Sequence, residues 1–173
     1  LKNYIHNPTK EKISEILALF ETQQAPLKGI KESAMAESAE VGSTFLNVFH
    51  LDDDEEVLEA MRLHLSSFDC DVKSFSCHDK MKERILKGDI PDLFIIDHKM
   101  PLISGNQVIT ALNGILPRIP KVLLSGYVNK DIVVESVNKG AIGVLEKPVD
   151  NFSLGRVLKR VRDMKSQNTI TRD

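Results

Sequence analysis

From residue 44 onward, short segments with apolar residues alternate with helical patterns, and these segments predict strands. The predicted strands are Phe45–Leu51, Asp71–Phe75, Leu93–Ile96, Lys121–Leu124 and Gly143–Glu146. Leu93–Ile96 is an unbroken apolar segment with a turn signal on each side. Such a segment is typical of a strand that is buried on both faces, in the middle of a parallel sheet.

Between these segments, apolar residues spaced three and four apart predict helices. The helices are expected from the acidic residues after Leu51 to about Ser67, from His78 to Lys87, from Gly105 to about Asn113, from Asn129 to Lys139 and from Asn151 to about Met164. Asn113-Gly114 and Gly140 are the expected stops of the third and fourth helices. In the fourth helix, Ile132, Val133 and Val137 are expected to face inward.

Strands that alternate with helices imply an α/β domain, with a parallel sheet covered on both faces through right-handed crossovers. Periodicity alone does not fix the strand order, but the doubly wound order 2-1-3-4-5 fits a chain of this size. We expect this domain to span residues 44–165. A polar and frayed tail is expected at residues 166–173.

Residues 1–43 differ from the rest and predict an N-terminal helical extension and linker. Asn7-Pro8 is a helix start signal, and Ile13, Ile16, Leu17 and Phe20 form one apolar stripe. A single amphipathic helix of this length is marginal in water, so the stripe should be buried against another surface. That surface is either the neighbouring domain or a second copy of the chain, as in a homodimer.

Composition restricts the class of protein. The 173 residues suffice for one domain and an appendage, and 42% of them are hydrophobic. The net charge of −2 and the pI near 6.2 give no sign of direct nucleic-acid binding by this segment. No apolar run approaches the ~20 residues of a membrane span, and no signal-peptide pattern is present. We therefore expect a cytoplasmic protein without membrane contact, with Cys70 and Cys77 reduced. Because the first residue is Leu1, part of the native protein is expected to lie outside this chain.

Chemically reactive side chains follow four of the five predicted strands. They are Asp52 and Asp53, Asp97, Ser125, and Lys147. All strands of a parallel sheet end at the same edge, so these groups should converge on one crevice, with the Asp97 carboxylate exposed there. Taken singly, each has a plain structural explanation: a helix N-terminus for the acids, a turn for Ser125 and a strand exit for Lys147. Their joint occurrence favours a functional site.

Carboxylates packed this closely repel one another unless a cation joins them. Oxygen ligands without His or Cys suit a hard ion, and Mg²⁺ typically uses one or two carboxylates together with a phosphate oxygen. Lys147 adds a positive charge and Ser125 a hydrogen-bond donor. This set indicates a receptor for a phosphoryl group, with Asp97 as the nucleophile that accepts it.

Four segments together resemble the receiver domain of two-component response regulators, the CheY-like member of the flavodoxin-like folds. They are VFHLDDDEEV, DLFIIDHKMPLISG, KVLLSGY and GAIGVLEKPV, within a resemblance that extends from Thr44 to about Lys165. The resemblance implies that Asp97 is the phosphoacceptor and that Asp52, Asp53, Asp97 and the backbone carbonyl of Lys99 bind Mg²⁺. It implies Ser125 as the switch hydroxyl, Lys147 as the phosphate-facing lysine, and a cis Lys147–Pro148 bond.

The chain departs from the family pattern at Val144, where the fifth strand usually carries Tyr or Phe. No aromatic ring can move behind Ser125 from that position, so readout of the signal should differ from the usual one. Tyr127, two residues after Ser125, is either a gate to the phosphate or an exposed loop residue.

The resemblance implies a phosphorelay signalling protein rather than an enzyme. Its expected partners are a histidine kinase or phosphotransfer protein, with an output domain or effector outside this chain. The alternative is a receiver-like domain that is not phosphorylated and serves only protein interaction or dimerisation. An Asp-dependent phosphatase would want a second acid at Lys99, and a dinucleotide-binding fold would want a Gly-rich turn where Asp52 and Asp53 stand.

Overall fold

The computed structural model describes residues 45–170, with side chains as far as Gln167. The expected N-terminal extension, including the stripe of Ile13, Ile16, Leu17 and Phe20, lies outside the described residues. In the described part, no helix is long and apolar enough to cross a membrane.

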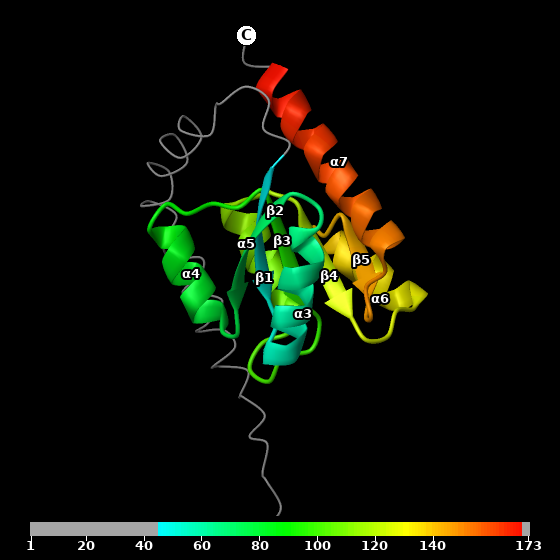
Figure 1. Ribbon diagram of the computed structural model, residues 1–173. Helices are drawn as coiled ribbons and strands as arrows, with labels where there is room; N and C mark the ends of the chain where they lie inside the picture. The colour runs from blue at the N-terminus through cyan, green and yellow to red at the C-terminus, as the bar shows by residue number, and fades with distance from the viewer. Residues whose placement is uncertain (1–44, 171–173) are drawn as a thin grey trace, which may run out of the picture.

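Strands and helices alternate without interruption through the described residues (Figure 1). In chain order they are β1 (Leu46–Leu51), α3 (Glu55–Ser66), β2 (Cys70–Phe75), α4 (His78–Leu86), β3 (Leu93–Asp97), α5 (Gly105–Ile115), β4 (Lys121–Ser125), α6 (Lys130–Asn138), β5 (Gly143–Glu146) and α7 (Asn151–Ile170).

The strands form one parallel sheet in the order β2-β1-β3-β4-β5, which confirms the predicted order. β3 lies at its centre between β1 and β4, and all five of its residues are buried. The prediction of a central strand buried on both faces is therefore confirmed. β5 is an edge strand, paired on one side with β4.

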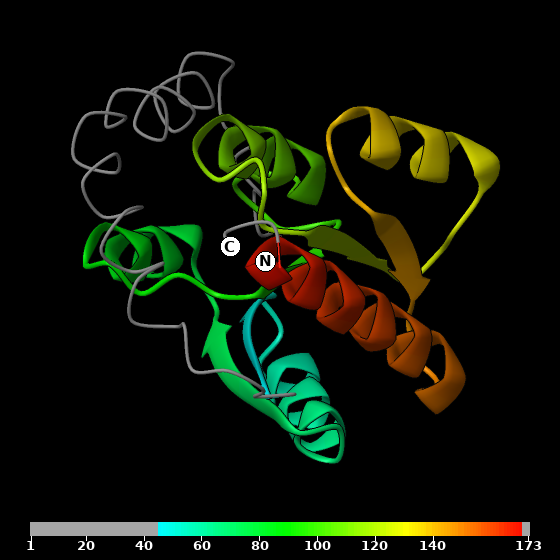
Figure 2. The same cartoon turned by 90° about the horizontal axis from the view of Figure 1, so that it is seen from above.

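Helices cover both faces of the sheet and create two apolar cores (Figure 2). The first core joins β-strand residues such as Phe49 and Ile96 to α4 and α5, with Ile132 of α6 at its margin. The second joins Val48 and Ile95 to α3 and α7. Successive residues of each strand thus point to opposite cores, as the period of two requires.

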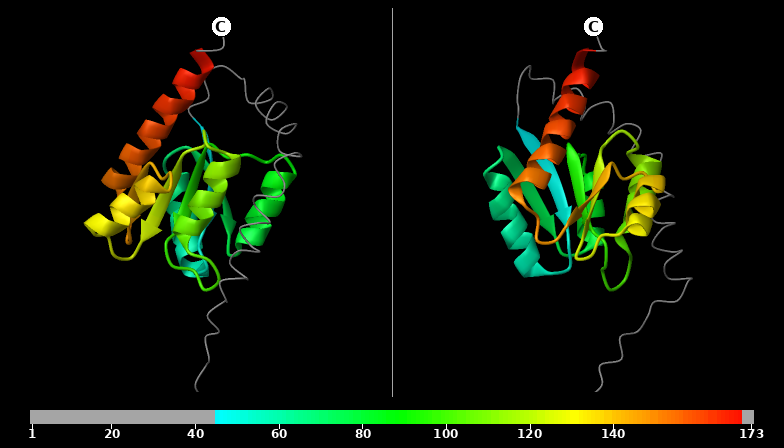
Figure 3. Two further views of the ribbon diagram at one scale, coloured as in Figure 1. Left: turned by 180° about the vertical axis from the view of Figure 1, so that it is seen from behind. Right: turned by 90° about the vertical axis from the view of Figure 1, so that its right-hand side faces the viewer.

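Two predicted helix ends were wrong. α5 continues past Gly114 to Ile115, because Ile115 and Leu116 are buried and their packing outweighs the local stop signal. α7 continues to Ile170 through the expected frayed tail, and its C-terminal end projects beyond the sheet (Figure 3). Lys165 ties this part of α7 to the domain by bonding Asp92 at 3.0 Å and the Phe45 carbonyl at 3.4 Å.

The predicted inward face of α6 was wrong at Val137, which is 49% exposed. Ser136 is the buried residue of this helix, and Ile132 and Val133 are half-buried. The buried face is therefore set by Ile132 and Ser136, four positions apart, rather than by the more apolar Val137.

Candidate functional site

The acidic side chains lie where β1 and β3 end, at the carboxyl edge of the sheet. Asp52 follows β1 directly and is 1% exposed, whereas the next residue, Asp53, is exposed. Asp97 is the last residue of β3 and is only 5% exposed, so the expectation of an exposed Asp97 was wrong. The loop after β3 folds back over it, with the Gly105 N–H donating to the His98 carbonyl at 3.0 Å.

Gly105 is required by this loop. A Cβ at that position would collide with the backbone carbonyl of Asp97 and lie 2.7 Å from Cδ1 of Leu123. Ser104 caps the following helix α5 through a reciprocal pair of hydrogen bonds with Gln107, a capping box that sequence reasoning missed although Ser104 and Gln107 have the required spacing. The close turn and the capped helix together bury Asp97.

Lys147, one residue past β5, joins the two buried carboxylates. Its Nζ lies 2.6 Å from Oδ2 of Asp52 and 2.7 Å from Oδ1 of Asp97. The ammonium group thus stabilises two negative charges that would otherwise repel each other in a poorly solvated place. Burial lowers the pKa of Lys147, but the hydrogen bonds to Asp52 and Asp97 outweigh it and raise the pKa overall.

Asp97 is held at both of its carboxylate oxygens. Oδ1 faces Lys147, and Oδ2 accepts a hydrogen bond of 2.8 Å from the backbone N–H of Lys99. Burial raises the pKa of Asp97 above its ordinary value, and the negative charge of Asp52 acts in the same direction. The bonds from Lys147 and Lys99 oppose this rise and favour the ionised form that a nucleophile needs.

The three expected metal ligands lie close together. One carboxylate oxygen from each of Asp52, Asp53 and Asp97 can be chosen so that all lie within 4.8 Å of one another. Two of these acids are buried and Asp53 is exposed, so the group opens to solvent on one side. An all-oxygen set of this kind fits a hard divalent cation that keeps some of its water.

Of the acidic residues that follow β1, Asp54 is the one that caps helix α3. Its Oδ1 accepts hydrogen bonds from the N–H groups of Glu56 at 2.9 Å and Val57 at 3.4 Å, which caps α3. Asp52 in turn accepts the N–H of Asp54 at 2.9 Å. Asp54 performs the capping, and the side chains of Asp52 and Asp53 are directed to the acidic group instead.

Ser125 ends β4 and is buried, but its hydroxyl is engaged with its own loop. The Oγ donates to the Tyr127 carbonyl at 2.7 Å and accepts from the Tyr127 N–H at 3.3 Å. It also lies 3.4 Å from Nδ1 of His98, a neighbour that sequence reasoning did not single out. A ligand at Asp97 would have to draw this hydroxyl away from Tyr127 in order to be bound by it.

The model of the response regulator receiver domain family matches residues 48–159, which include all of these site residues. The chain belongs to this family. The matched range falls inside the receiver domain expected at residues 44–165, and the Lys147–Pro148 bond is cis, as the resemblance implied.

Curated relatives of this receiver domain are response regulators from bacteria. The phosphoglycerate transport system transcriptional regulatory protein PgtA of Salmonella typhimurium is 30% identical over 117 residues, which cover 68% of this chain and 27% of PgtA. The tetrathionate response regulatory protein TtrR of the same organism is 28% identical over 125 residues, which cover 71% of this chain and 59% of TtrR. The chain therefore spans only part of the length of these relatives.

Solved structures support the CheY-like receiver fold. A response regulator receiver domain protein from Clostridium thermocellum superposes with a TM-score of 0.64 at 22% identity, covering 70% of this chain and 97% of that one. A CheY-like receiver domain protein from Methanospirillum hungatei JF-1 gives a TM-score of 0.64 at 20% identity, covering 71% and 98%.

At the position of the usual aromatic residue, this receiver domain has a half-buried Val144. The valine packs at the margin of the first core, as does Ile132 of α6. The ring of Tyr127 is no substitute inside the core, because Tyr127 is 66% exposed. The structure thus places both residues but assigns no readout role to either.

Sequence reasoning also missed His50, a polar residue within the apolar run of β1. It is 0% exposed, and neither ring nitrogen has a hydrogen-bond partner among the described residues. Burial lowers the pKa of His50 to about 4, against the attraction of Asp52, so the ring is neutral near pH 7. Its position two residues before Asp52 was the signal that could have drawn attention to it.

Proposed function

We propose that Asp97 of this receiver domain accepts a phosphoryl group from a phosphohistidine donor. The observation that supports this most is the contact of Lys147 with both Asp52 and Asp97, at 2.6 and 2.7 Å. A half-buried lysine between two buried acids holds one carboxylate ionised and leaves a positive charge beside the place where phosphoryl oxygens would arrive.

Asp52 and Asp53, together with Asp97, would hold Mg²⁺, and the backbone carbonyl of Lys99 would be a further ligand. Their all-oxygen donor set and mutual proximity fit this ion. When bound, Mg²⁺ supplies positive charge that offsets the charge of the phosphoryl oxygens.

In the transfer, a carboxylate oxygen of Asp97 forms a bond to phosphorus as the bond from phosphorus to the donor's imidazole nitrogen breaks. The electron pair of the broken bond stays on that nitrogen. Lys147 keeps Asp97 deprotonated before transfer and then binds a phosphoryl oxygen. Ser125 exchanges its bond to the Tyr127 carbonyl for a bond to another phosphoryl oxygen, and this exchange couples phosphorylation to the loop after β4.

The functional consequence is a change in partner or dimer interactions rather than turnover of a substrate. A bound dianion would favour one of two arrangements of the loop after β4 and of α6, which follows it. The donor would be a histidine kinase or phosphotransfer protein. An output domain or effector would read the result, in line with the regulatory names of the relatives.

The test is phosphorylation of the full chain by acetyl phosphate in the presence of Mg²⁺, followed by intact mass measurement. The wild type should gain the mass of one phosphoryl group, and Asp97→Asn should gain none. Asp92→Asn is the matched control, because Asp92 lies at the opposite end of β3. Equal labelling of the wild type and Asp97→Asn would show that the acceptor lies elsewhere. An unlabelled wild type that also fails to bind beryllofluoride would favour a receiver-like interaction domain.

A further inference from the structure

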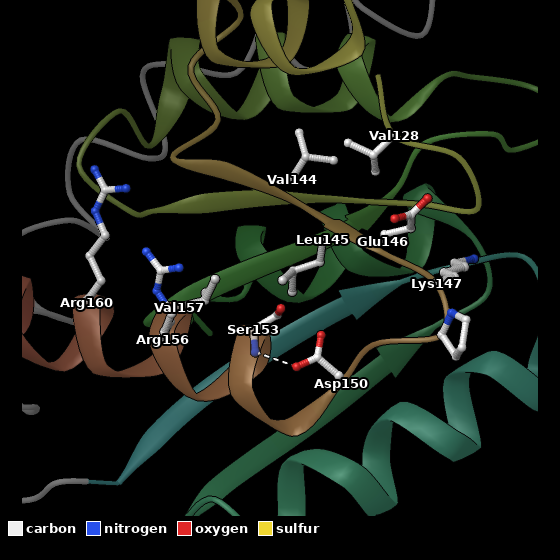
Figure 4. A pocket seen from close by; sticks show the side chains of 11 residues that line it. Val128, Val144, Leu145, Glu146, Lys147, Asp150, Ser153, Arg156, Val157 and Arg160 are labelled. Carbon is white, nitrogen blue, oxygen red and sulfur yellow. Dashed lines mark hydrogen bonds between the residues drawn. The ribbon is translucent and has the colours of Figure 1, made fainter. Parts of the chain in front are cut away.

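A groove lies beside the edge strand β5, between the loop after β4 and helix α7 (Figure 4). Its volume is about 580 Å³. Its apolar lining includes Val128, Val144, Leu145 and Val157, and Arg156 and Arg160 of α7 also line it. The groove is large enough for several apolar side chains.

The small side chain of Val144 helps to keep this groove open, since a Tyr or Phe at that position would occupy part of it. β5 and the two residues after it line the groove continuously from Val144 to Pro148, so backbone as well as side chains face the groove. Val134 and Val137 of α6 and Phe152 of α7 are also exposed, at 49%, 49% and 73%. Exposed apolar side chains on both helices that contact β5 favour a contact surface on this side of the domain.

The helix that forms one wall of the groove is basic. From Arg156 to Lys165, α7 carries five positive residues and one negative residue, namely Arg156, Lys159, Arg160, Arg162 and Lys165 against Asp163. Arg156 and Arg160 are exposed where they line the groove. A ligand of this surface should therefore combine an apolar face with negative charge.

The chain's own N-terminal region has both properties. Its stripe of Ile13, Ile16, Leu17 and Phe20 needs an apolar partner. The segment from residue 32 to 44 contains three glutamates and no Lys, Arg or Asp, so all of its charged residues are acidic. It leads directly into Phe45, whose carbonyl accepts a bond from Lys165 of α7 at 3.4 Å. The residue that follows the acidic segment is thus in contact with the basic helix.

The distance from this entry point to the groove is short compared with the available chain. Lys165 and Arg156 are nine residues apart on α7, about 14 Å along the helix axis. The 19 residues from Pro26 to Thr44 can extend over ~60 Å. Length therefore does not prevent the stripe from reaching the groove of its own molecule.

We propose that this groove is the docking site of the chain's own N-terminal segment, with Ile13, Ile16, Leu17 and Phe20 against Val144 and Val157. Glu32, Glu37 and Glu40 then run along the basic side of α7. In this position the segment covers the free edge of β5 and competes with any partner of that face. The proposal concerns an interaction surface and does not depend on phosphorylation of Asp97.

The experiment compares ¹⁵N–¹H NMR spectra of the full chain and of two variants in the N-terminal segment. Leu17→Asp/Phe20→Asp places charges on the stripe. Leu19→Asp is the matched control, because Leu19 points about 100° away from the stripe on a helix. The double variant should shift the amide signals of residues 144–146 and 156–160, and the control should leave them unchanged. Both variants leave the sequence of residues 45–170 unchanged, and equal thermal unfolding midpoints would show that loss of folding does not cause a shift.

Charge reversal on the groove side supplies the reciprocal measurement. Arg156→Glu, at an exposed position, should shift the amide signals of residues 13–20 and 32–40, whereas Lys80→Glu on the exposed surface of α4 should not. Sedimentation over a range of concentrations then identifies the source of the segment. A monomer with concentration-independent shifts supports docking within one molecule. A dimer would overturn it in favour of a second copy, and unchanged groove signals in the stripe variant would overturn docking altogether.

Discussion

Lys147 reaches Asp97 from a more solvated position, because the lysine side chain is 24% exposed and the carboxylate side chain 7%. The same ammonium also contacts Asp52 at 2.6 Å. One cation therefore serves two buried anions, and the charge at this edge of the sheet is not fully compensated. The stability of the domain should consequently respond to removal of either sign of charge.

Asp97→Asn should stabilise the domain, because it removes a buried charge while Lys147 keeps its bond to Asp52. The pKa of Asp97 in the folded protein is raised above 3.8. Protonated Asp97 therefore contributes its full share to the stability of the domain below about pH 3.8. This share is lost as the pH rises through the raised pKa and the buried side chain becomes charged. We expect the melting temperature at pH 7 to increase by roughly 2–6 °C.

The measurement is thermal unfolding between pH 4 and pH 8 without divalent cations, and the gain of Asp97→Asn should grow with pH. Asp163→Asn, on the exposed side of α7, should show no such trend. A gain that is constant over this range would mean that ionisation of Asp97 is not the cause.

Lys147→Met should destabilise the domain by about 1–3 kcal/mol in the absence of divalent cations, because it leaves Asp52 and Asp97 without their shared cation. Added Mg²⁺ should recover more stability in this variant than in the wild type. The readout is the urea midpoint with EDTA and with Mg²⁺. Lys159→Met breaks the exposed pair with Asp163 and should change the stability by under ~0.5 kcal/mol.

Lys121→Met should stabilise the domain near pH 7. Lys121 is 1% exposed at the start of β4, and its Nζ donates to the Leu116 carbonyl at 2.5 Å and to Oδ1 of Asn113 at 3.4 Å. Burial lowers its pKa from 10.5 to about 8. The charged Lys121 thus destabilises the domain by its full amount below about pH 8. This destabilisation decreases as the pH rises toward 10.5. Allowing for the two lost hydrogen bonds, we expect a gain of about 1–2 kcal/mol.

Urea unfolding at pH 7 and at pH 10 tests this, with Lys80→Met on the surface of α4 as the control. The gain from Lys121→Met should shrink at the higher pH, while the control should show little effect at either. A loss of stability at pH 7 would mean that the bonds to Leu116 and Asn113 are worth more than the charge burial costs.

Gly105→Ala should cost about 2–3 kcal/mol, since its Cβ would collide with the Asp97 carbonyl and Leu123. The shift of the loop should also reduce labelling of Asp97 by acetyl phosphate. Gly114→Ala in the same helix is the opposite case, because its Cβ meets no atom within 4 Å. That variant should gain about 0.5–1 kcal/mol in unfolding experiments. Equal effects at the two glycines would contradict the close approach at Gly105.

Sequence reasoning succeeded where topology alone decides the outcome. In a parallel sheet the residues after each strand must meet at one edge, so the proximity of Asp52, Asp97 and Lys147 needed no knowledge of packing. The strand order was less secure, because periodicity carries no information about which strands are neighbours.

The features that were missed depend on loop conformation and on packing rather than on the period of apolar residues. Asp97 is buried because the loop to Gly105 returns over it, and α5 passes Gly114 because Ile115 finds an apolar pocket. The bond from Ser125 to Tyr127 depends on the conformation of the loop after β4. None of these is encoded in a local pattern of polar and apolar residues.

Helix α6 buries few side chains against the sheet, and this affects how easily it opens. Its one buried residue, Ser136, bonds within the helix to the Ile132 carbonyl at 2.6 Å rather than to the sheet. Detaching α6 exposes little apolar surface, so its opening free energy should lie far below that of global unfolding. Amide protons of α6 should then exchange with solvent well before those of β3, and this helix is the part of the fold that a small input of binding energy can displace.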